Sequence, residues 1–479
     1  MTTKKLESQL LTFDFNEKTI TDVECNIEIE DDAQWKKIFV TSRDYRLTEI
    51  QDQPNVDVKI THSGSDGEVV KETSINKASV RGFSIVFGRV GTISFYLYPK
   101  DVYVTQRVSP ATGKTKLTLN YYINKAPIIS PFYRLIPNEQ GEVKREAQNP
   151  LAFPLANNLN LSSEISFTYS LKGDHFESDR YQLLRLTLRK RKDSVKYIKE
   201  VITPKVNDFL MLVSLLHDSK VNFTSWRMVC DGLYIWYYKS QGMTADAIDE
   251  NSLKELIDRK YLQEFIIECF PVYQSSEYKA SIDNAIYTLM LDRNNVIELS
   301  FLSYFQALES MVLTYKRLSN TEFNFANNTF RKLRALIEKT IDNEIPDDRE
   351  LSRKLKNKLG ELNRVSLKDA TQDFYSELRV DSSNIWPLFD DKPKGIIGLT
   401  TIRNVLIHGD LLPPEKLRSV AIACQHLRVL LIRCVFALLG WDHKKTKVHS
   451  EYLMTRNYLF EPSTLTEALC DIHSYFVAK

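Results

Sequence analysis

The sequence lacks the features that would indicate several common classes of protein. Its 479 residues include only six cysteines, and no two of them form a Cys-x-x-Cys pair. Scattered cysteines of this kind fit neither a disulfide framework nor a zinc site, so we expect a reducing, cytoplasmic location. The first residues lack the apolar core of a signal peptide, and no uninterrupted apolar run approaches membrane-spanning length. We therefore expect no membrane partner.

Several motifs of catalytic and cofactor sites are also missing. There is no glycine-rich phosphate loop, no nucleophile elbow and no internal repeat. His217 is expected at the surface, at the end of a helix. Four further histidines have no metal-binding spacing and are expected to be structural or exposed: His426, His443, His449 and His473. We therefore expect neither a metal nor a cofactor.

The numbers of basic and acidic residues nearly cancel, so the protein is not strongly basic. With 64 basic and 62 acidic residues the formal net charge is +2, so any surface that binds nucleic acid must be a local patch. Residues 185–199 hold seven basic side chains, and a solvated edge-strand face is favoured over phosphate contact there. A second basic stretch is interrupted by acids, which again favours a solvated face, with the wall of an RNA-guiding groove as the functional alternative. Its candidate RNA-binding residues are Arg353, Lys354, Lys356 and Lys358.

Residues 1–242 carry the alternating apolar pattern of β-strands. Alternation is clear around Val23–Ile29 and Val56–Ile60, and aromatic and β-branched residues dominate Phe83–Tyr98. Asp231-Gly232, between two apolar runs, fits the two-residue type I′ turn of a hairpin. The pattern predicts an antiparallel β-rich domain, either sandwich-like or an open barrel.

From residue 243 to residue 479 the apolar period becomes that of helices. The segment Asn294–Leu318 is hydrophobic nearly all round and is expected to be central. A buried stripe is expected on the helix after Pro346, at Leu351, Leu355, Leu359 and Leu362. A long helix from Pro414 to Leu439 carries a stripe of leucine, valine and cysteine, which a core helix and a seam between two subunits would both explain. The fold class expected for the whole chain is α+β, with an all-α second domain.

The segment Thr400–Asp410 holds the strongest candidate for a site. Asn404 and His408 are four residues apart, which places them on one face of a helix, and the side chain of Arg403 reaches the same space. Aliphatic residues 405–407 are expected to pin the helix to a core. Gly409 is expected to cap it in the left-handed conformation. A permanent cation beside an imidazole suits chemistry on phosphate esters.

Glu309 is the candidate supporting residue. It shares a helix face with Leu302, Phe305 and Val312, where an unpaired carboxylate would be costly. Arg403 is a suitable partner for it, and an exposed position at the edge of that helix explains the pattern equally well. The loop 384–394, just before the motif helix, could gate the site.

The motif from Arg403 to His408, together with Phe301–Met311 upstream, resembles the HEPN superfamily, and within it the ApeA-like HEPN proteins. The resemblance implies a metal-independent endoribonuclease with Arg403, His408 and Asn404 as catalytic residues. It also implies an RNA substrate and a homodimer in which two motifs face each other.

The same resemblance implies a biological context, as a toxin-like effector of anti-phage abortive infection. Residues 1–242 would then be a sensor or regulatory domain that responds to a phage or cellular trigger. The alternatives are a non-catalytic HEPN module that binds RNA or protein and dimerises, or a scaffold whose β-rich domain does the recognising.

Overall fold

The computed structural model separates the chain into two compact units. Unit 1 comprises Met1–Val213 and Val221–Leu253, and unit 2 comprises Ser214–Lys220 and Lys254–Lys479. The residues described are 2–31, 37–51, 53–63, 69–87, 91–108, 113, 115–124, 126–131, 133–137, 143–147, 151–156, 159–172, 175–191, 193–239, 255–290, 296–409 and 412–477. The expected domain boundary after residue 242 lies outside them. An antiparallel β region followed by a helical region confirms the α+β fold class.

The first six strands of unit 1 form a closed barrel. They are β1 (Thr2–Phe15), β2 (Lys18–Asp31), β3 (Ile38–Ser42), β4 (Val56–Ser63), β5 (Val69–Val86) and β6 (Thr92–Tyr98). The order β5-β4-β1-β2-β3-β6 closes because β6 also pairs with β5. The barrel is filled by buried side chains such as Phe13, Val40 and Phe95, together with Leu47 and Ile50 from the short helix Tyr45–Ile50. The pairing of β5 with β6 therefore closes this part of the sheet into a barrel.

The same sheet continues beyond the barrel, because the first half of the long strand β5 also pairs with β7. The order runs on through β7 (Asp101–Arg107), β15 (Leu233–Lys239), β14 (Phe223–Cys230), β8 (Lys116–Ile123), β13 (His175–Arg189), β12 (Leu159–Lys172) and β11 (Leu151–Ala156). Strands β9 (Tyr133–Pro137) and β10 (Val143–Ala147) form a separate pair. Asp231 and Gly232 have φ of 50° and 76°, which confirms the predicted type I′ turn between β14 and β15.

A helical segment follows β13 and joins the two units. It comprises α1 (Ser194–Tyr197), a π-helical turn (Ile198–Ile202) and α2 (Thr203–His217). Phe209 of α2 packs on Phe153 of β11, with ring centroids 5.1 Å apart. His217 ends α2 and is completely buried, so its expected surface position was wrong. The helix end packs within unit 2 instead of reaching solvent.

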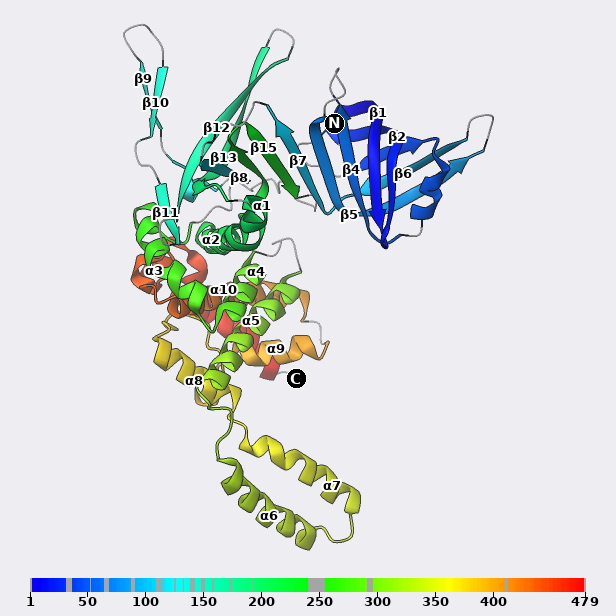
Figure 1. Ribbon diagram of the computed structural model, residues 1–479. Helices are drawn as coiled ribbons and strands as arrows, with labels where there is room; N and C mark the ends of the chain where they lie inside the picture. The colour runs from blue at the N-terminus through cyan, green and yellow to red at the C-terminus, as the bar shows by residue number, and fades with distance from the viewer. Residues whose placement is uncertain are drawn as a thin grey trace. The chain divides into compact units, whose positions relative to one another are not determined.

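Unit 2 is helical, and its longest helices are α5 and α10 (Figure 1). Its α-helices are α3 (Leu262–Ser275), α4 (Lys279–Leu289), α5 (Ile297–Leu318), α6 (Asn327–Glu344), α7 (Arg349–Lys358), α8 (Leu367–Leu378), α9 (Leu399–Ile407), α10 (Leu417–Leu438), α11 (Ser450–Arg456) and α12 (Pro462–Val477). Helix α5 packs against α4, α8, α9 and α10. It is therefore central, as its apolar sequence predicted.

Helix α10 forms the core of unit 2. Leu427, Leu431 and Cys434 are completely buried inside this one chain. The stripe that could have been a seam between subunits is thus a core stripe. The segment Pro414–Leu438 is the one described helix long and apolar enough to cross a membrane by length and composition. Of its most apolar window 78% is buried in the protein, as expected for a core helix.

Helices α6 and α7 pair with each other beyond the rest of unit 2 (Figure 1). The predicted buried stripe on α7 was largely wrong. Leu351, Leu355 and Leu362 are 43%, 37% and 58% exposed, and of the four leucines Leu359 alone is buried. Helix α6 has no buried residue. A hairpin of two helices covers only the face that each turns to the other, so the remaining apolar side chains stay in solvent.

Candidate functional site

The start of α9 is fixed by the loop that precedes it. The carboxylate of Asp390 accepts hydrogen bonds from the backbone N–H of Gly398 (2.7 Å) and the hydroxyl of Thr401 (2.9 Å). The first of these bonds satisfies a backbone donor that a helix N-terminus leaves unpaired, and the second ties the first turn of α9 to the loop. A Cβ on Gly398 would lie 2.4 Å from the backbone carbon of Phe389, so only glycine fits there. The direction of α9, and with it the placement of Arg403, depends on this close approach.

Arg403 is held by three neighbours from two helices. Its Nη2 lies 3.2 Å from Oε2 of Glu309 on α5, and its Nη1 donates to Oδ1 of Asn404 at 3.1 Å. The guanidinium carbon lies 5.6 Å from the ring centroid of Phe305, also on α5. The Arg403 side chain keeps 30% of its surface exposed. The cation is thus oriented by fixed groups and still reaches solvent.

His408 follows the last residue of α9. Its backbone N–H donates to the carbonyl of Asn404 (3.1 Å), and Gly409 has φ of +81°, as the predicted left-handed cap requires. The side chains of Asn404 and His408 are both exposed. Ile407 is 51% exposed, so it does not pin the helix to the core as expected. Leu399 and Ile402, in the first half of α9, are the buried anchors instead.

The arrangement offers a cation and an imidazole to the solvent at one end of a helix. Such groups can contact a phosphate diester and exchange a proton with it. Each chain supplies one such histidine at the end of α9. In the described part of the chain, no group of three or more histidine, cysteine, aspartate or glutamate side chains is placed to hold a metal ion.

The loop 384–394 is anchored to the core. Trp386 is 1% exposed, and its indole N–H donates to the carbonyl of Ile397 at 2.9 Å. Arg433 of α10, itself buried, donates to the carbonyl of Ser383 at the start of the loop (3.2 Å). The loop therefore has a role in holding the start of α9. A gating movement gains no support from these contacts.

The four candidate RNA-binding residues lie on α7, which is not part of the arrangement around Arg403. Lys354 pairs with Glu350 (2.8 Å), and Lys356 pairs with Asp342 of α6 (2.5 Å). Arg353 and Lys356 line a groove of about 560 Å³ between the two helices, and Lys358 ends α7. Local ion pairs of this kind fit a solvated helix face.

In the other basic stretch, several of the described side chains also have local partners. Arg185 pairs with Glu164 (2.8 Å) and Lys190 with Asp231 (3.6 Å). Lys199 lies over the ring of Tyr103, 3.8 Å from its centroid. These contacts agree with a solvated face, but the expected edge strand was wrong, because β13 pairs with β12 on one side and with β8 on the other.

Sequence reasoning missed the residues that position the motif. Asp390 and Gly398 act through the start of α9, and nothing in their types or spacing distinguishes them from ordinary loop residues. Phe305 was assigned to the apolar face of its helix, but its contact with Arg403 depends on the packing of α9 against α5. The family comparison covers all three positions. Residues 302–445 match the family model described as Apea-like HEPN.

Residues 302–445 form an Apea-like HEPN domain. The HEPN domain spans less than a third of the chain and contains Glu309, Arg403, Asn404 and His408. It confirms the resemblance noted from the motif, and HEPN families are typically associated with nucleases. The domain thus suggests a nuclease-type or defence function.

The other comparisons add little to this assignment. No curated protein matches the chain. Among solved structures, MrkH of K. pneumonia in its apo state is similar over 42% of this chain and 87% of its own, at 10% identity and a TM-score of 0.14. So low a score supports no statement about fold or function.

Proposed function

We propose that this protein is a metal-independent endoribonuclease whose catalytic residues are Arg403, Asn404 and His408. The observation that carries the proposal is the guanidinium of Arg403, paired with Glu309 within a HEPN domain and placed five residues before the exposed His408. A fixed cation contributes to catalysis only if negative charge develops next to it in the transition state. An RNA phosphate that also contacts His408 would place that charge beside Arg403.

The reaction uses the 2′-hydroxyl of RNA as the nucleophile. A base removes the proton of the 2′-hydroxyl, the 2′-oxygen forms a bond to phosphorus, and the bond from phosphorus to the 5′-oxygen breaks as an acid protonates that oxygen. Arg403 stabilises the negative charge that develops on the phosphorane, and Asn404, which accepts a hydrogen bond from Arg403, orients a phosphate oxygen or the imidazole of His408. The products are a 2′,3′-cyclic phosphate and a 5′-hydroxyl. DNA, which lacks the 2′-hydroxyl, is not cleaved by this route.

Both an acid and a base are needed, and each chain supplies one His408. We therefore propose that the active form is a homodimer in which two motifs face each other. The buried stripe of α10 is not the contact, because its residues are inside the subunit. The end of α9, with its exposed His408 and Ile407, has to lie at the interface instead.

The proposed role is that of a toxin-like effector in anti-phage abortive infection. The β-rich unit 1 would sense a phage or cellular trigger and restrain or release the HEPN domain. This part of the proposal is supported by the Apea-like HEPN match.

Purified protein incubated with total RNA in EDTA tests the nuclease. We expect cleavage that leaves 2′,3′-cyclic phosphate ends, and a loss of about 10³-fold in His408→Ala. The matched control is His443→Ala, which changes a histidine with a side chain 40% exposed outside the motif and should leave cleavage unchanged. Equal cleavage by the wild type and His408→Ala would contradict the proposal, as would the absence of cleavage during phage infection of cells that express the wild type.

Mixing experiments test the shared site. Excess His408→Ala subunits should lower the activity of each wild-type subunit, because the shared site of a mixed dimer contains only one His408. An unchanged activity per wild-type subunit at every ratio would show that one chain is sufficient.

A second function, a non-catalytic HEPN module that binds RNA or protein, is favoured by one observation. The ion pair of Arg403 with Glu309 and the cap at His408 can also serve to stabilise the end of a helix. In that case an Arg403→Ala, His408→Ala double variant would lose stability. If the variant keeps its melting temperature and loses cleavage, the structural role is excluded.

A further inference from the structure

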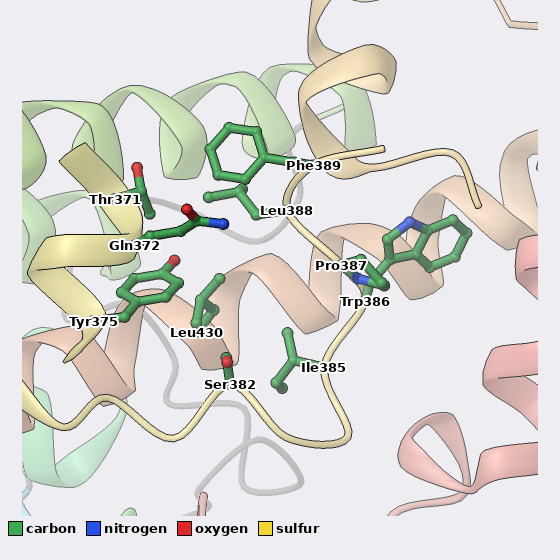
Figure 2. A pocket seen from close by; sticks show the side chains of 10 residues that line it. All are labelled: Thr371, Gln372, Tyr375, Ser382, Ile385, Trp386, Pro387, Leu388, Phe389 and Leu430. Carbon is green, nitrogen blue, oxygen red and sulfur yellow. The ribbon is translucent and has the colours of Figure 1, made fainter. Parts of the chain in front are cut away.

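A cavity of about 260 Å³, open to solvent at the exposed residues Gln372 and Ser382, lies in the HEPN domain between α8, α10 and the loop 382–389 (Figure 2). Its lining residues are Thr371, Gln372, Tyr375, Ser382, Ile385, Trp386, Pro387, Leu388, Phe389 and Leu430. None of them carries a formal charge. The cavity is therefore unsuited to a phosphate or a carboxylate and favours a neutral, largely apolar group.

The hydroxyl of Tyr375 is the unusual group in this cavity. It is buried and has no hydrogen-bond partner among the described residues. In the view of Figure 2 it points to the side of the cavity on which Thr371 and Gln372 are drawn. Burial raises the pKa of this phenol well above its ordinary value, so the hydroxyl stays protonated and is available as a donor. A buried polar group without a partner is costly, so an acceptor placed against it would be favoured.

The other lining groups specify the shape of the occupant. Two aromatic rings, those of Tyr375 and Phe389, come from two separate segments and can contact the face of a planar molecule, whereas the Trp386 indole is 1% exposed and is turned away from them in Figure 2. The amide of Gln372 offers two donors and an acceptor, which suits a hydrogen-bonding edge that carries both kinds of group. The indole N–H of Trp386 is already bonded to Ile397 and is not available.

We propose that this cavity binds a single nucleobase. A nucleobase is neutral and planar, and its edge carries acceptors and donors side by side. An apolar cavity of 150 Å³ holds benzene, and drug-sized ligands take cavities from about 300 Å³ upward, so about 260 Å³ suits one base. The base can come from a free nucleoside or from an unpaired position of an RNA strand.

The wall of the cavity also holds the start of α9. The carbonyls of Pro387 and Leu388 accept the backbone N–H groups of Leu399 (3.0 Å) and Thr400 (2.9 Å). A bound base would thus contact the segment from which the motif helix begins. The binding itself does not depend on RNA cleavage, and it is measured on a protein that cannot cleave.

The test uses full-length His408→Ala protein and two sets of probes. The first set is adenosine, guanosine, cytidine and uridine, and the second is a short single-stranded RNA of mixed sequence. Binding is followed by isothermal titration and by the shift in melting temperature. We expect saturable binding in at least one set, weakened about tenfold by Tyr375→Phe, which removes only the hydroxyl. The matched control Tyr287→Phe, at a tyrosine that is 55% exposed on α4, should change nothing.

The stability of the free protein gives a second readout. Because Tyr375→Phe removes an unpaired buried hydroxyl, the variant should melt at the same temperature as its parent or higher, yet gain less from the ligand. Binding of nucleosides assigns the cavity to a free base, and binding of RNA alone assigns it to a base within a strand. The absence of saturable binding in both sets, or binding that Tyr375→Phe leaves intact, would overturn the proposal whether or not the wild type cleaves RNA.

Discussion

Nη2 of Arg403 on α9 lies 3.2 Å from Oε2 of Glu309 on α5, a residue 94 positions earlier in the chain. Both side chains remain partly exposed, at 30% and 23%. An ion pair open to solvent contributes at most about 1 kcal/mol to stability, so its main effect is on the direction of the guanidinium. Glu309 is thus a positioning residue for the proposed chemistry.

Replacing Glu309 by glutamine should lower activity far more than stability. The neutral amide no longer fixes the guanidinium, and a small displacement of a transition-state cation reduces kcat by about 10²-fold. The free energy of unfolding should change by no more than about 1 kcal/mol. Single-turnover cleavage and urea denaturation measure the two effects.

The control for that variant is Glu298→Gln, which changes a carboxylate in the first turn of the same helix, away from Arg403. It should retain wild-type cleavage. A Glu309→Gln protein that cleaves as fast as the wild type would show that Arg403 needs no partner from α5.

Alanine at Gly398 should destabilise the HEPN domain. The added methyl group would meet the backbone of Phe389 at 2.4 Å, and backbone cannot move aside as a flexible side chain can. We expect a loss of about 1–3 kcal/mol in the free energy of unfolding. Gly360→Ala is the matched control, because nothing lies within 4 Å of a Cβ at that position. It should be neutral or slightly stabilising. Equal effects of the two substitutions would contradict this account of the start of α9.

The stability of unit 2 should fall in mild acid because of His426. Its Nδ1 accepts the backbone N–H of Trp386 (3.1 Å), so its Nε2 donates to the carbonyl of Leu459 (3.0 Å), and the ring is neutral. Burial, together with the charge of Arg433, lowers the pKa of His426 to about 4, against the hydrogen bond to Leu459. In the unfolded chain the ring takes up a proton near pH 6.5.

The direction of this pH dependence follows from the number of protons that the folded and unfolded states bind. Between about pH 6.5 and pH 4 the unfolded state binds a proton that the folded state refuses, so the contribution of His426 is complete above this window and lost toward its lower end. His217, also buried with a pKa lowered to about 4, acts in the same direction. Urea denaturation at pH 7.5, 6 and 5 should show a steady fall in the midpoint. A midpoint for unit 2 that is equal at pH 7.5 and pH 5 would contradict the burial of both rings as neutral groups.

Local sequence patterns were sufficient for some elements of the fold. Asp231-Gly232 specified its turn, since few residues other than glycine and asparagine or aspartate adopt positive φ at both positions. The apolar pattern of α5 showed that the helix is central, because a helix that is apolar nearly all round must be buried. The closure of the barrel by β5 and β6 could not be foreseen, since it depends on pairing between strands that are distant in sequence.

For the candidate site, the sequence by itself predicted which residues would carry the proposed chemistry. The spacing of Arg403, Asn404 and His408, with Gly409 after them, fixes a helix end and the face it presents, because helical geometry is local. Only the tertiary structure decided that Glu309 pairs with Arg403, that α10 is core, and that the α7 leucines stay in solvent. Those outcomes depend on which helices pack together, and a stripe of leucines has the same pattern whether it meets a core, a second subunit or water.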